Sequence, residues 1–437
     1  MNRGTGGLRS IAPMTGAPVV MLASGTRGDV QPFLALAVGL RRAGIPVLIA
    51  AAPRFRSFVE DRGVDFAALD GNPSDLMAGA SGSMAASLSG GVVRGIASTF
   101  RFLRAAQPEF RRMLESAVAA CRPARVILAG LSSTWGLSIA EALGVPCMLC
   151  MLQPFGRTGA FPSALMPVRL SLGRRYNALS YRVIEQAMWL PWRRTTNHWR
   201  RRTLGLPSYP ESGPWKELYA GGFPCLYGFS PAVLPAPADW PPDHIVTGYW
   251  FLEETTGWAP RPDLVRFLSS ADPPLYIGFG SMGTGFSRGT FLVLHRALEL
   301  SGLRAVVSTG GELLPPKAGP RMFFVEDAPH AWLFPRVTAV MHHGGAGTTA
   351  EGLRAGVPSL IFPVAADQYL WAERVARLGA GAHPVGRGDL NPGALARLFR
   401  RAATDQGMRG RARLIGERIR AENGVTRAVE ALLPLIG

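Results

Sequence analysis

Histidine, glycine and acidic residues concentrate in one stretch of the sequence, from Ala339 to Gln368. A short apolar run ends there at His342 and His343, continues through a glycine turn at 344–347, and enters a segment of helix-forming composition. Backbone amides in a glycine turn can approach an anion closely, and the start of a helix adds a partial positive charge. This order of strand, turn and helix predicts a binding site for a phosphate or diphosphate.

Two polar residues, Asp367 and Gln368, follow the next strand-like run, Ser359 to Phe362. Because parallel strands end at the same edge of a sheet, this pair and the glycine turn are expected to face one crevice. Each candidate also has a simpler structural role: a core position for the histidine, a solvated helix surface for Glu351, and a helix cap for Asp367. Their combination at this spacing favours ligand binding.

Strands and helices alternate along the rest of the chain. A regular framework of this kind is needed to hold the candidate binding residues in place. The apolar run from Val19 to Ser24 is followed by helical spacing from Val30 to Arg42 and by a second strand-like run from Val47 to Ala52. The same alternation returns as far as Leu152. It predicts an α/β protein with a doubly wound parallel sheet, whose ligands lie at the carboxyl ends of the strands.

The sequence HHGGAGTTAEGLRAGVPSLIFPVAADQ resembles the donor-sugar signature of the family 1 nucleotide-sugar-dependent glycosyltransferases. The similarity is strongest to the sterol glucosyltransferase-like and antibiotic glycosyltransferase branches. It extends to ASGTRGDVQPFLALAVGLRRAG and to NALSYRVIEQAMWLPWRRTTNHWRRRTLGLP, and so covers most of the chain. This resemblance implies the GT-B fold, in which two doubly wound Rossmann-like domains face a cleft.

The length of 437 residues also favours two domains, and prolines are frequent from Leu234 to Pro274. We therefore expect a flexible leader at 1–16, an N-terminal acceptor-binding domain at 17–235, a linker at 236–271 and a C-terminal donor-binding domain at 272–437. The last helices of the chain are candidates for packing back on the N-terminal domain.

The resemblance assigns roles to individual residues. The donor diphosphate would be bound by Thr26, Ser281, His343, Gly345, Gly347 and Thr348, the nucleoside by Val325, Ala328 and Glu351, and the sugar hydroxyls by Asp367 and Gln368. Val325 stands where plant relatives carry a tryptophan that stacks on uracil. Backbone groups around Val325 and Ala328 would then recognise the base. The sequence therefore does not distinguish a uridine from a thymidine nucleotide as the donor.

Asp29 is the candidate for the base that activates the acceptor. Related enzymes place this base in the loop after the first strand, commonly as histidine, and the branch with GTRGD-like loops offers aspartate there. The chain contains no histidine before His198. The structural alternative is that Asp29 caps a helix beginning at Val30. Asp367, expected to face the same cleft, is the second catalytic candidate.

The resemblance implies the transfer of a hexose from a UDP- or dTDP-sugar to a hydroxyl of a lipophilic acceptor, such as a sterol or polyketide-like product. UDP-glucose is the donor that we expect first. The transfer is expected to invert the anomeric configuration and to need no metal ion. No cofactor is expected, and no metal, because the chain has no Asp-x-Asp pair to hold an ion at the diphosphate. The alternatives are a nucleotide-sugar epimerase or hydrolase and a catalytically idle nucleotide-sugar-binding partner protein.

Gly278, Gly280 and Gly283 match a dinucleotide fingerprint, but no acid ends the following strand, which disfavours a dehydrogenase.

The net charge of +17 comes almost entirely from arginine. No nucleic-acid-binding motif accompanies it, so nucleic acid is not an expected partner.

Between Arg169 and Arg202, nine arginines are interleaved with tyrosines and tryptophans. This composition is typical either of a contact with an anionic membrane or of a solvated surface whose tryptophans pack inward. Four scattered cysteines and the lack of a long apolar run favour a cytoplasmic protein, with peripheral contact at the inner membrane face as the further expectation.

Overall fold

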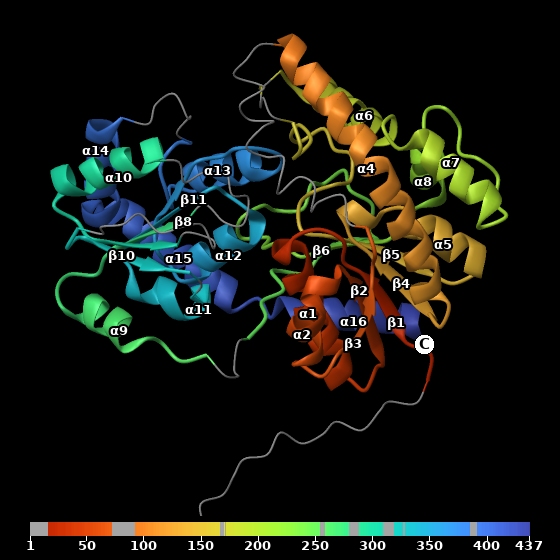
Figure 1. The fold of residues 1–437 in the computed structure, drawn as a ribbon, viewed down its shortest axis with the longest axis horizontal. Coiled ribbons are helices and arrows are strands. Elements are labelled where there is room, and N and C mark those ends of the chain that lie inside the picture. The colour runs from red at the N-terminus through yellow and green to blue at the C-terminus, as the bar shows by residue number, and fades with distance from the viewer. Residues whose placement is uncertain are drawn as a thin grey trace, which may run out of the picture.

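The computed structural model describes residues 16–71, 92–166, 170, 172–253, 258–278, 288–308, 319–326, 328–384 and 391–437. The expected leader lies outside these residues except for Gly16. The described chain forms two α/β lobes (Figure 1), each built around a parallel sheet. This architecture confirms the predicted fold class of two doubly wound Rossmann-like domains.

The first lobe contains a seven-stranded sheet in the order β3-β2-β1-β4-β5-β6-β7. Its strands are β1 (Val19–Leu22), β2 (Val47–Ala51), β3 (Asp65–Ala68), β4 (Val126–Ala129), β5 (Cys147–Met151), β6 (Cys225–Tyr227) and β7 (His244–Val246). The edge strand β7 comes from the proline-rich range 236–271. The helices of this lobe are α1 (Arg27–Arg42), α2 (Arg56–Glu60), α4 (Val92–Cys121), α5 (Gly136–Leu143), α6 (Arg174–Trp189), α7 (Arg193–Arg202) and α8 (Trp215–Gly221).

The second lobe contains a five-stranded sheet in the order β10-β9-β8-β11-β12. Its strands are β8 (Leu275–Gly278), β9 (Ala305–Ser308), β10 (Met322–Val325), β11 (Ala339–His342) and β12 (Ser359–Ile361). The helices after β7 are α9 (Pro262–Ser269), which falls within the expected linker, and α10 (Arg288–Ser301), α11 (His330–Leu333), α12 (Ala346–Arg354), α13 (Gln368–Arg377), α14 (Pro392–Thr404), α15 (Gln406–Arg420) and α16 (Gly424–Ile436).

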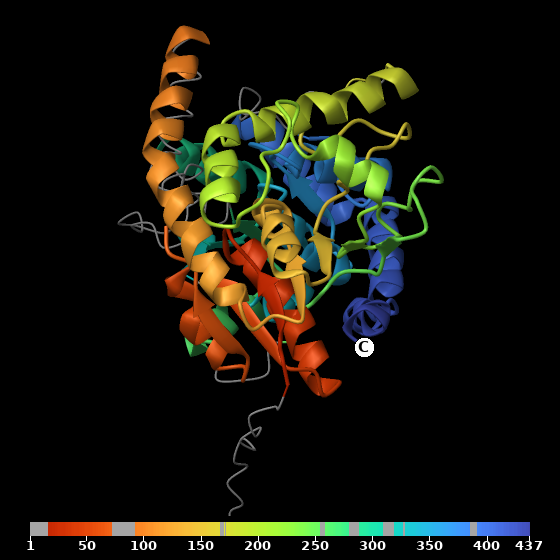
Figure 2. The same cartoon turned by 90° about the vertical axis from the view of Figure 1, so that its right-hand side faces the viewer.

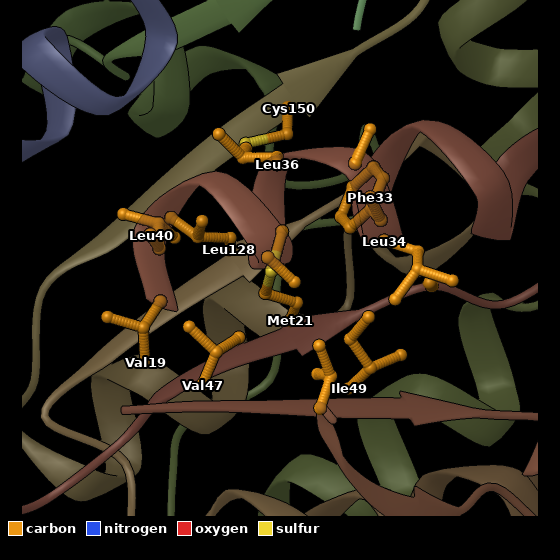
Figure 3. Close-up of a cluster of buried hydrophobic side chains, with 14 of the residues drawn as sticks. Val19, Met21, Phe33, Leu34, Leu36, Leu40, Val47, Ile49, Leu128 and Cys150 are labelled. Carbon is orange, nitrogen blue, oxygen red and sulfur yellow. The ribbon is translucent and has the colours of Figure 1, made fainter. Parts of the chain in front are cut away.

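The core of the first lobe fixes the position of α1. All four residues of β1 are buried, as expected for a central parallel strand that is covered on both faces. In Figure 3, side chains of α1 pack against residues of β1, β2, β4 and β5. The labelled residues are Phe33, Leu34, Leu36, Leu40, Val19, Met21, Val47, Ile49, Leu128 and Cys150. This packing holds the first turn of α1 at the carboxyl end of β1.

The chain crosses between the lobes twice. The first crossing follows β7, and the second lies between α15 and α16, so that α16 packs on α1 in the first lobe although it follows the helices of the second (Figure 1). The crossings touch each other: a Cβ atom on Gly424 would lie 2.4 Å from the carbonyl oxygen of Tyr249. Nearby, the Ser230 hydroxyl donates a hydrogen bond of 2.5 Å to Glu422.

Candidate active site between the two lobes

Both sheets reverse their strand order at the place where the candidate residues lie. The reversal falls between β1 and β4 in the first sheet and between β8 and β11 in the second. Asp29 follows β1, and His343 follows β11. Because ligands of open parallel sheets bind beside the carboxyl ends of the strands at such reversals, the topology places each residue at the expected binding edge of its lobe.

Asp29 belongs to a capping box at the start of α1. The helix begins at Arg27, and Thr26 is its N-cap residue. The backbone N–H and the hydroxyl of Thr26 both donate to Oδ2 of Asp29, at 2.7 and 3.0 Å. Asp29 is therefore the third residue of the helix, and the expectation of a helix beginning at Val30 is wrong. Thr26, a predicted diphosphate ligand, is exposed and bonded to Asp29.

The pKa of Asp29 is raised above the ordinary value of an aspartate. Burial is the largest cause, and the two hydrogen bonds from Thr26 oppose it without cancelling it. A carboxylate with a raised pKa is a stronger base than an exposed aspartate. The local structure thus both orients Asp29 and increases its basicity.

Asp367 approaches Asp29 from the second lobe. The pKa of Asp367 is raised to about 6: burial is the largest cause, a hydrogen bond from Trp371 opposes it, and the negative charge of Asp29 adds to it. The indole N–H of Trp371 donates to Oδ2 of Asp367 at 2.8 Å. The charge of Asp29 thus contributes to the raised pKa of Asp367, although the two residues belong to different lobes.

Gln368 is buried, and its side chain supports the loop before Asp367. Its Oε1 atom accepts hydrogen bonds from the backbone N–H groups of Val364, at 2.7 Å, and Ala365, at 3.1 Å. The next residue, Ala366, has a positive φ of 53°, a conformation that is uncommon for alanine. Gln368 therefore holds a strained loop in place, and its predicted contact with a sugar stays a prediction.

The two adjacent histidines have different environments. His342 is fully buried, and its Nδ1 accepts a hydrogen bond of 3.0 Å from the backbone N–H of Gly344. His343 is half-buried, and its ring lies so close to Gly345 that a Cβ there would be 2.6 Å from Nε2. Burial lowers the pKa of His343 to about 4, so its imidazole is neutral at physiological pH and retains one N–H donor. Among the described residues, its Nδ1 has no hydrogen-bond partner.

The start of α12 carries the remaining diphosphate candidates. Gly345 is the N-cap residue, Gly347 is exposed, and Thr348 is half-buried in the first turn. A Cβ on Gly347 would meet nothing within 4 Å, so packing within the protein does not require a glycine there. Glu351 lies one turn further along the helix and is buried. The helix start is thus open on the side where an anion would bind.

The other nucleoside candidates have buried side chains. Val325 ends β10, and Ala328 follows it; both pack in a cluster with Tyr276, Leu333 and Phe334. Their side chains are therefore engaged in the core, which leaves backbone groups for ligand contact. Ser281, together with Gly280 and Gly283 of the glycine fingerprint, lies outside the described residues.

Sequence reasoning missed Trp371, which contacts a candidate catalytic residue directly. Its side chain is completely buried, and its ring lies 5.9 Å from that of Phe229, a residue of the first lobe. The sequence spacing could have indicated this contact. Asp367 and Trp371 are four residues apart at the start of a helix and therefore lie on the same face.

Comparisons with known proteins agree with this architecture. Residues 19–162 match the model of the glycosyltransferase family 28 N-terminal domain, and residues 317–433 match that of the erythromycin biosynthesis protein CIII-like C-terminal domain. The chain is 35% identical over 431 residues to a sterol 3-beta-glucosyltransferase of Leptosphaeria maculans and 34% identical to one of Emericella nidulans. Each alignment covers 95% of this chain, but the chain spans only 28% and 30% of those longer proteins.

Solved structures show the same fold at lower sequence identity. The glycotransferase of kitacinnamycin superposes with a TM-score of 0.70 at 18% identity, covering 97% of this chain and all of that one. The calicheamicin glycosyltransferase CalG4 gives 0.66 at 19% identity, covering 96% of this chain and 98% of that one. These structures show the GT-B fold. The two domain models and the sterol glucosyltransferase relatives show that the chain belongs to the family 1 glycosyltransferases, in the sterol glucosyltransferase-like and antibiotic glycosyltransferase branch.

Proposed function

We propose that the chain transfers a hexose from a UDP- or dTDP-sugar to a hydroxyl group of a lipophilic acceptor, such as a sterol or a polyketide-like natural product. The observation that carries this proposal is that Asp29 and His343 lie at the strand-order reversals of the two sheets, where α1 contacts α12 across the lobes. The relatives named sterol 3-beta-glucosyltransferase make a glucose donor the first to test, and UDP-glucose is our first choice. A similar fold was solved with dTDP for the glycosyltransferase VinC, which keeps thymidine donors in consideration.

The donor diphosphate would bind at the start of α12. The neutral imidazole of His343 would donate its remaining N–H, and the backbone around Gly345 and Gly347 would contribute the positive end of the helix. As the bond to the sugar breaks, negative charge grows on the diphosphate, and these fixed donors stabilise it. In this proposal the helix end takes the place of a divalent metal ion.

The acceptor hydroxyl would be activated by Asp29. Both hydrogen bonds from Thr26 engage Oδ2, which orients the carboxylate so that Oδ1 can take the proton. The deprotonated oxygen would attack the anomeric carbon on the side opposite the diphosphate and invert its configuration. Asp367, held by Trp371, would bind sugar hydroxyls from the facing lobe.

The direct test is product analysis by mass spectrometry. UDP-glucose, other UDP-sugars and dTDP-sugars would each be incubated with sterol, macrolide, flavonoid and carotenoid acceptors. A glycosylated acceptor with inverted anomeric configuration is the expected result. Free sugar formed without an acceptor would identify a hydrolase, an altered nucleotide-sugar would identify an epimerase, and nucleotide binding without any product would identify a binding partner.

The variant Asp29→Asn tests the proposed base. Asparagine can still accept a hydrogen bond from the backbone N–H of Thr26, so the capping box and the fold are expected to persist. Transfer should nevertheless fall by roughly two orders of magnitude or more, because the amide cannot take a proton. Turnover and nucleotide affinity would be measured together, with Asp61→Asn, at an exposed position of the same lobe, as the control. Near-normal turnover of Asp29→Asn would exclude this role.

Treatment with EDTA tests the proposed role of the helix end. If α12 and His343 stabilise the diphosphate without a metal ion, the rate should stay within about twofold of the untreated rate. A large loss that added Mg²⁺ or Mn²⁺ restores would refute this part of the mechanism and leave the glycosyltransferase assignment standing.

A further inference from the structure

The helix α6 has two faces of different character. Its inner face is buried and includes Tyr181, Glu185 and Trp189. Its outer side chains are apolar and exposed: Leu179 is 56% exposed, Val183 is 51% exposed, and Leu190, at the helix end, is 56% exposed. Large apolar side chains with this much exposure are unusual when they cluster, and such clusters mark interaction sites.

Arginines flank these apolar residues. Arg175 and Arg182 are exposed on the same side of α6, and Leu172, just before the helix, is 65% exposed. We define the apolar-basic face of α6 by Leu172, Arg175, Leu179, Arg182, Val183 and Leu190. Within the described part of the chain, neither Arg175 nor Arg182 forms an ion pair, whereas the neighbouring Arg174 pairs with Asp239. The only acidic residue of α6, Glu185, is buried and bonded to Arg157.

Several other residues of the arginine-rich segment have structural roles. Trp189 and Trp199 are buried. These tryptophans therefore pack inward, as expected if the segment is a solvated surface. Arg200 is only 2% exposed and forms an ion pair with Glu141 at 2.9 Å. Arg193 pairs with Glu211 at 3.5 Å. The apolar-basic face of α6 is therefore the part of this segment with both exposed apolar side chains and unpaired positive charge.

The inner face of α6 packs against loops of the first lobe. Tyr181, Ile184 and Glu185 line a narrow cavity of about 10 Å³, with room for about one water molecule. The same cavity is lined by Leu131 and Gln153, which follow β4 and β5 near the carboxyl ends of those strands. Figures 1 and 2 show α6 near the top edge of the first lobe. The inner face of α6 thus anchors the helix to this lobe, while its outer side chains are exposed.

We propose that the apolar-basic face of α6 docks on the surface of an anionic lipid bilayer. The apolar side chains would enter the boundary between head groups and acyl chains, while Arg175 and Arg182 would contact anionic head groups. The helix would lie in the plane of the membrane. No helix among the described residues is long and apolar enough to cross a bilayer. This inference goes beyond the proposed function, since it assigns a surface and a partner.

The charges on this face favour a membrane over a second copy of the chain. A symmetric dimer formed through the same face on both chains would bring the arginines of one copy towards those of the other. Like charges placed opposite each other are unfavourable, and the exposed side of α6 offers no acid to compensate them. An anionic lipid surface supplies the missing negative charge.

Sedimentation with lipid vesicles tests this proposal. The full chain, without donor or acceptor, would be mixed with phosphatidylcholine vesicles with and without phosphatidylglycerol. Binding should require phosphatidylglycerol and weaken at high salt. The double variant L179S/L190S should lower the vesicle partition coefficient roughly tenfold or more, because two apolar side chains are lost from the contact. R175Q/R182Q should lower it about tenfold on anionic vesicles.

The matched control is L292S/L414S, which removes two leucines of similar exposure, 58% and 59%, from the second lobe. It should bind vesicles like the parent. No sedimentation of the parent with anionic vesicles, or an equal loss in the control, would overturn the proposal. So would a parent dimer that L179S/L190S dissociates, because the face would then bind a second copy. Transfer to a detergent-solubilised acceptor should be unchanged in L179S/L190S, so failure of docking is distinguishable from failure of the proposed function.

Discussion

Asp29 and Asp367 are each partly buried, and each lacks a cationic partner in the contacts that set its pKa. Burial disfavours the ionised form of both, and the charge of one carboxylate disfavours ionisation of the other. At neutral pH this pair therefore costs folding free energy. Such a cost is common at active sites, where reactivity depends on groups that the fold does not neutralise.

The variant Asp367→Asn should be more stable than the parent at neutral pH. The pKa of Asp367 rises from 3.8 to about 6 on folding, so the folded state loses stability as the pH rises through this range and the carboxylate ionises. We expect the variant to gain about 1–3 kcal/mol in the free energy of unfolding at about pH 8. At about pH 4 most of the gain should be lost, because the carboxyl group of the parent is then protonated in the folded state and partly protonated in the unfolded state. Urea unfolding at both pH values measures this difference.

The same variant should lose transferase activity, because the proposed contact of Asp367 with sugar hydroxyls would be weakened. Asp405→Asn is a suitable control, because folding shifts the pKa of Asp405 in the opposite direction from that of Asp367. Its carboxylate caps α15 through the backbone N–H of Met408, and this bond lowers the pKa of Asp405. It should therefore gain no stability at any pH. An Asp367→Asn protein that is less stable than the parent at about pH 8 would contradict the repulsion argument.

Residue types and spacing were sufficient to identify Asp29, His343 and Asp367 as candidates. They were not sufficient to show which atoms are already engaged. The Oε1 atom of Gln368 supports its own loop, and Oδ2 of Asp29 accepts from Thr26, because local backbone geometry decides these bonds. The distance between Asp29 and Asp367 depends on how the two lobes pack against each other, which no local pattern encodes.

At the scale of elements, the start of α12 shows how glycines in one turn can have different purposes. Gly344 has a φ of 93°, and a Cβ there would lie 2.6 Å from Cγ2 of Ile361, so the fold requires this glycine. Gly347 has open space around its Cα. The turn therefore combines a residue needed for folding with one whose lack of a side chain matters only when a ligand is present.

The variant Gly347→Ala should separate these two purposes. Its stability should match or slightly exceed that of the parent, by up to about 1 kcal/mol, because alanine is favoured over glycine in a helix. Its affinity for a nucleoside diphosphate should fall roughly tenfold or more, since the new methyl group would obstruct an anion at the helix start. Calorimetric titration with UDP and dTDP measures the affinity.

Gly344→Ala is the contrasting variant, and thermal unfolding should show it destabilised without any ligand. Unchanged nucleotide affinity in Gly347→Ala would mean that the diphosphate does not lie against this turn. A Gly347→Ala protein that is unstable would instead show that the glycine has a structural role that its open surroundings do not reveal.

The elements themselves were largely predictable from sequence. Continuous apolar runs marked β1, β2, β11 and β12, because buried parallel strands need apolar side chains on both faces. The start of α1 was placed at Val30 because Arg27 and Gly28 lack apolar periodicity, although Thr26 and Asp29 have the spacing of a capping box. The inward packing of the tryptophans of α6 and α7 could not be chosen from composition, which fits a buried or an exposed face equally.

At the scale of the whole molecule, α16 joins the lobes by contributing to the core of the first one. Leu432 is fully buried in the cluster that contains Val19 and Leu36, while its neighbour Leu433 is 46% exposed. The variant Leu432→Ala should lower the free energy of unfolding by about 2–5 kcal/mol, and Leu433→Ala should change it by less than about 0.5 kcal/mol. Urea unfolding of the two variants measures the contrast, and equal effects would show that α16 is not part of this core in solution.

The contact between the two crossings gives the molecule a mechanical character. Gly424 lies against the backbone at Tyr249, so both connections between the lobes pass through one narrow place. If one lobe rotated about this place, displacement would be smallest there and would grow with distance from it. The separation of Asp29 and Asp367 would then report how far the lobes had closed.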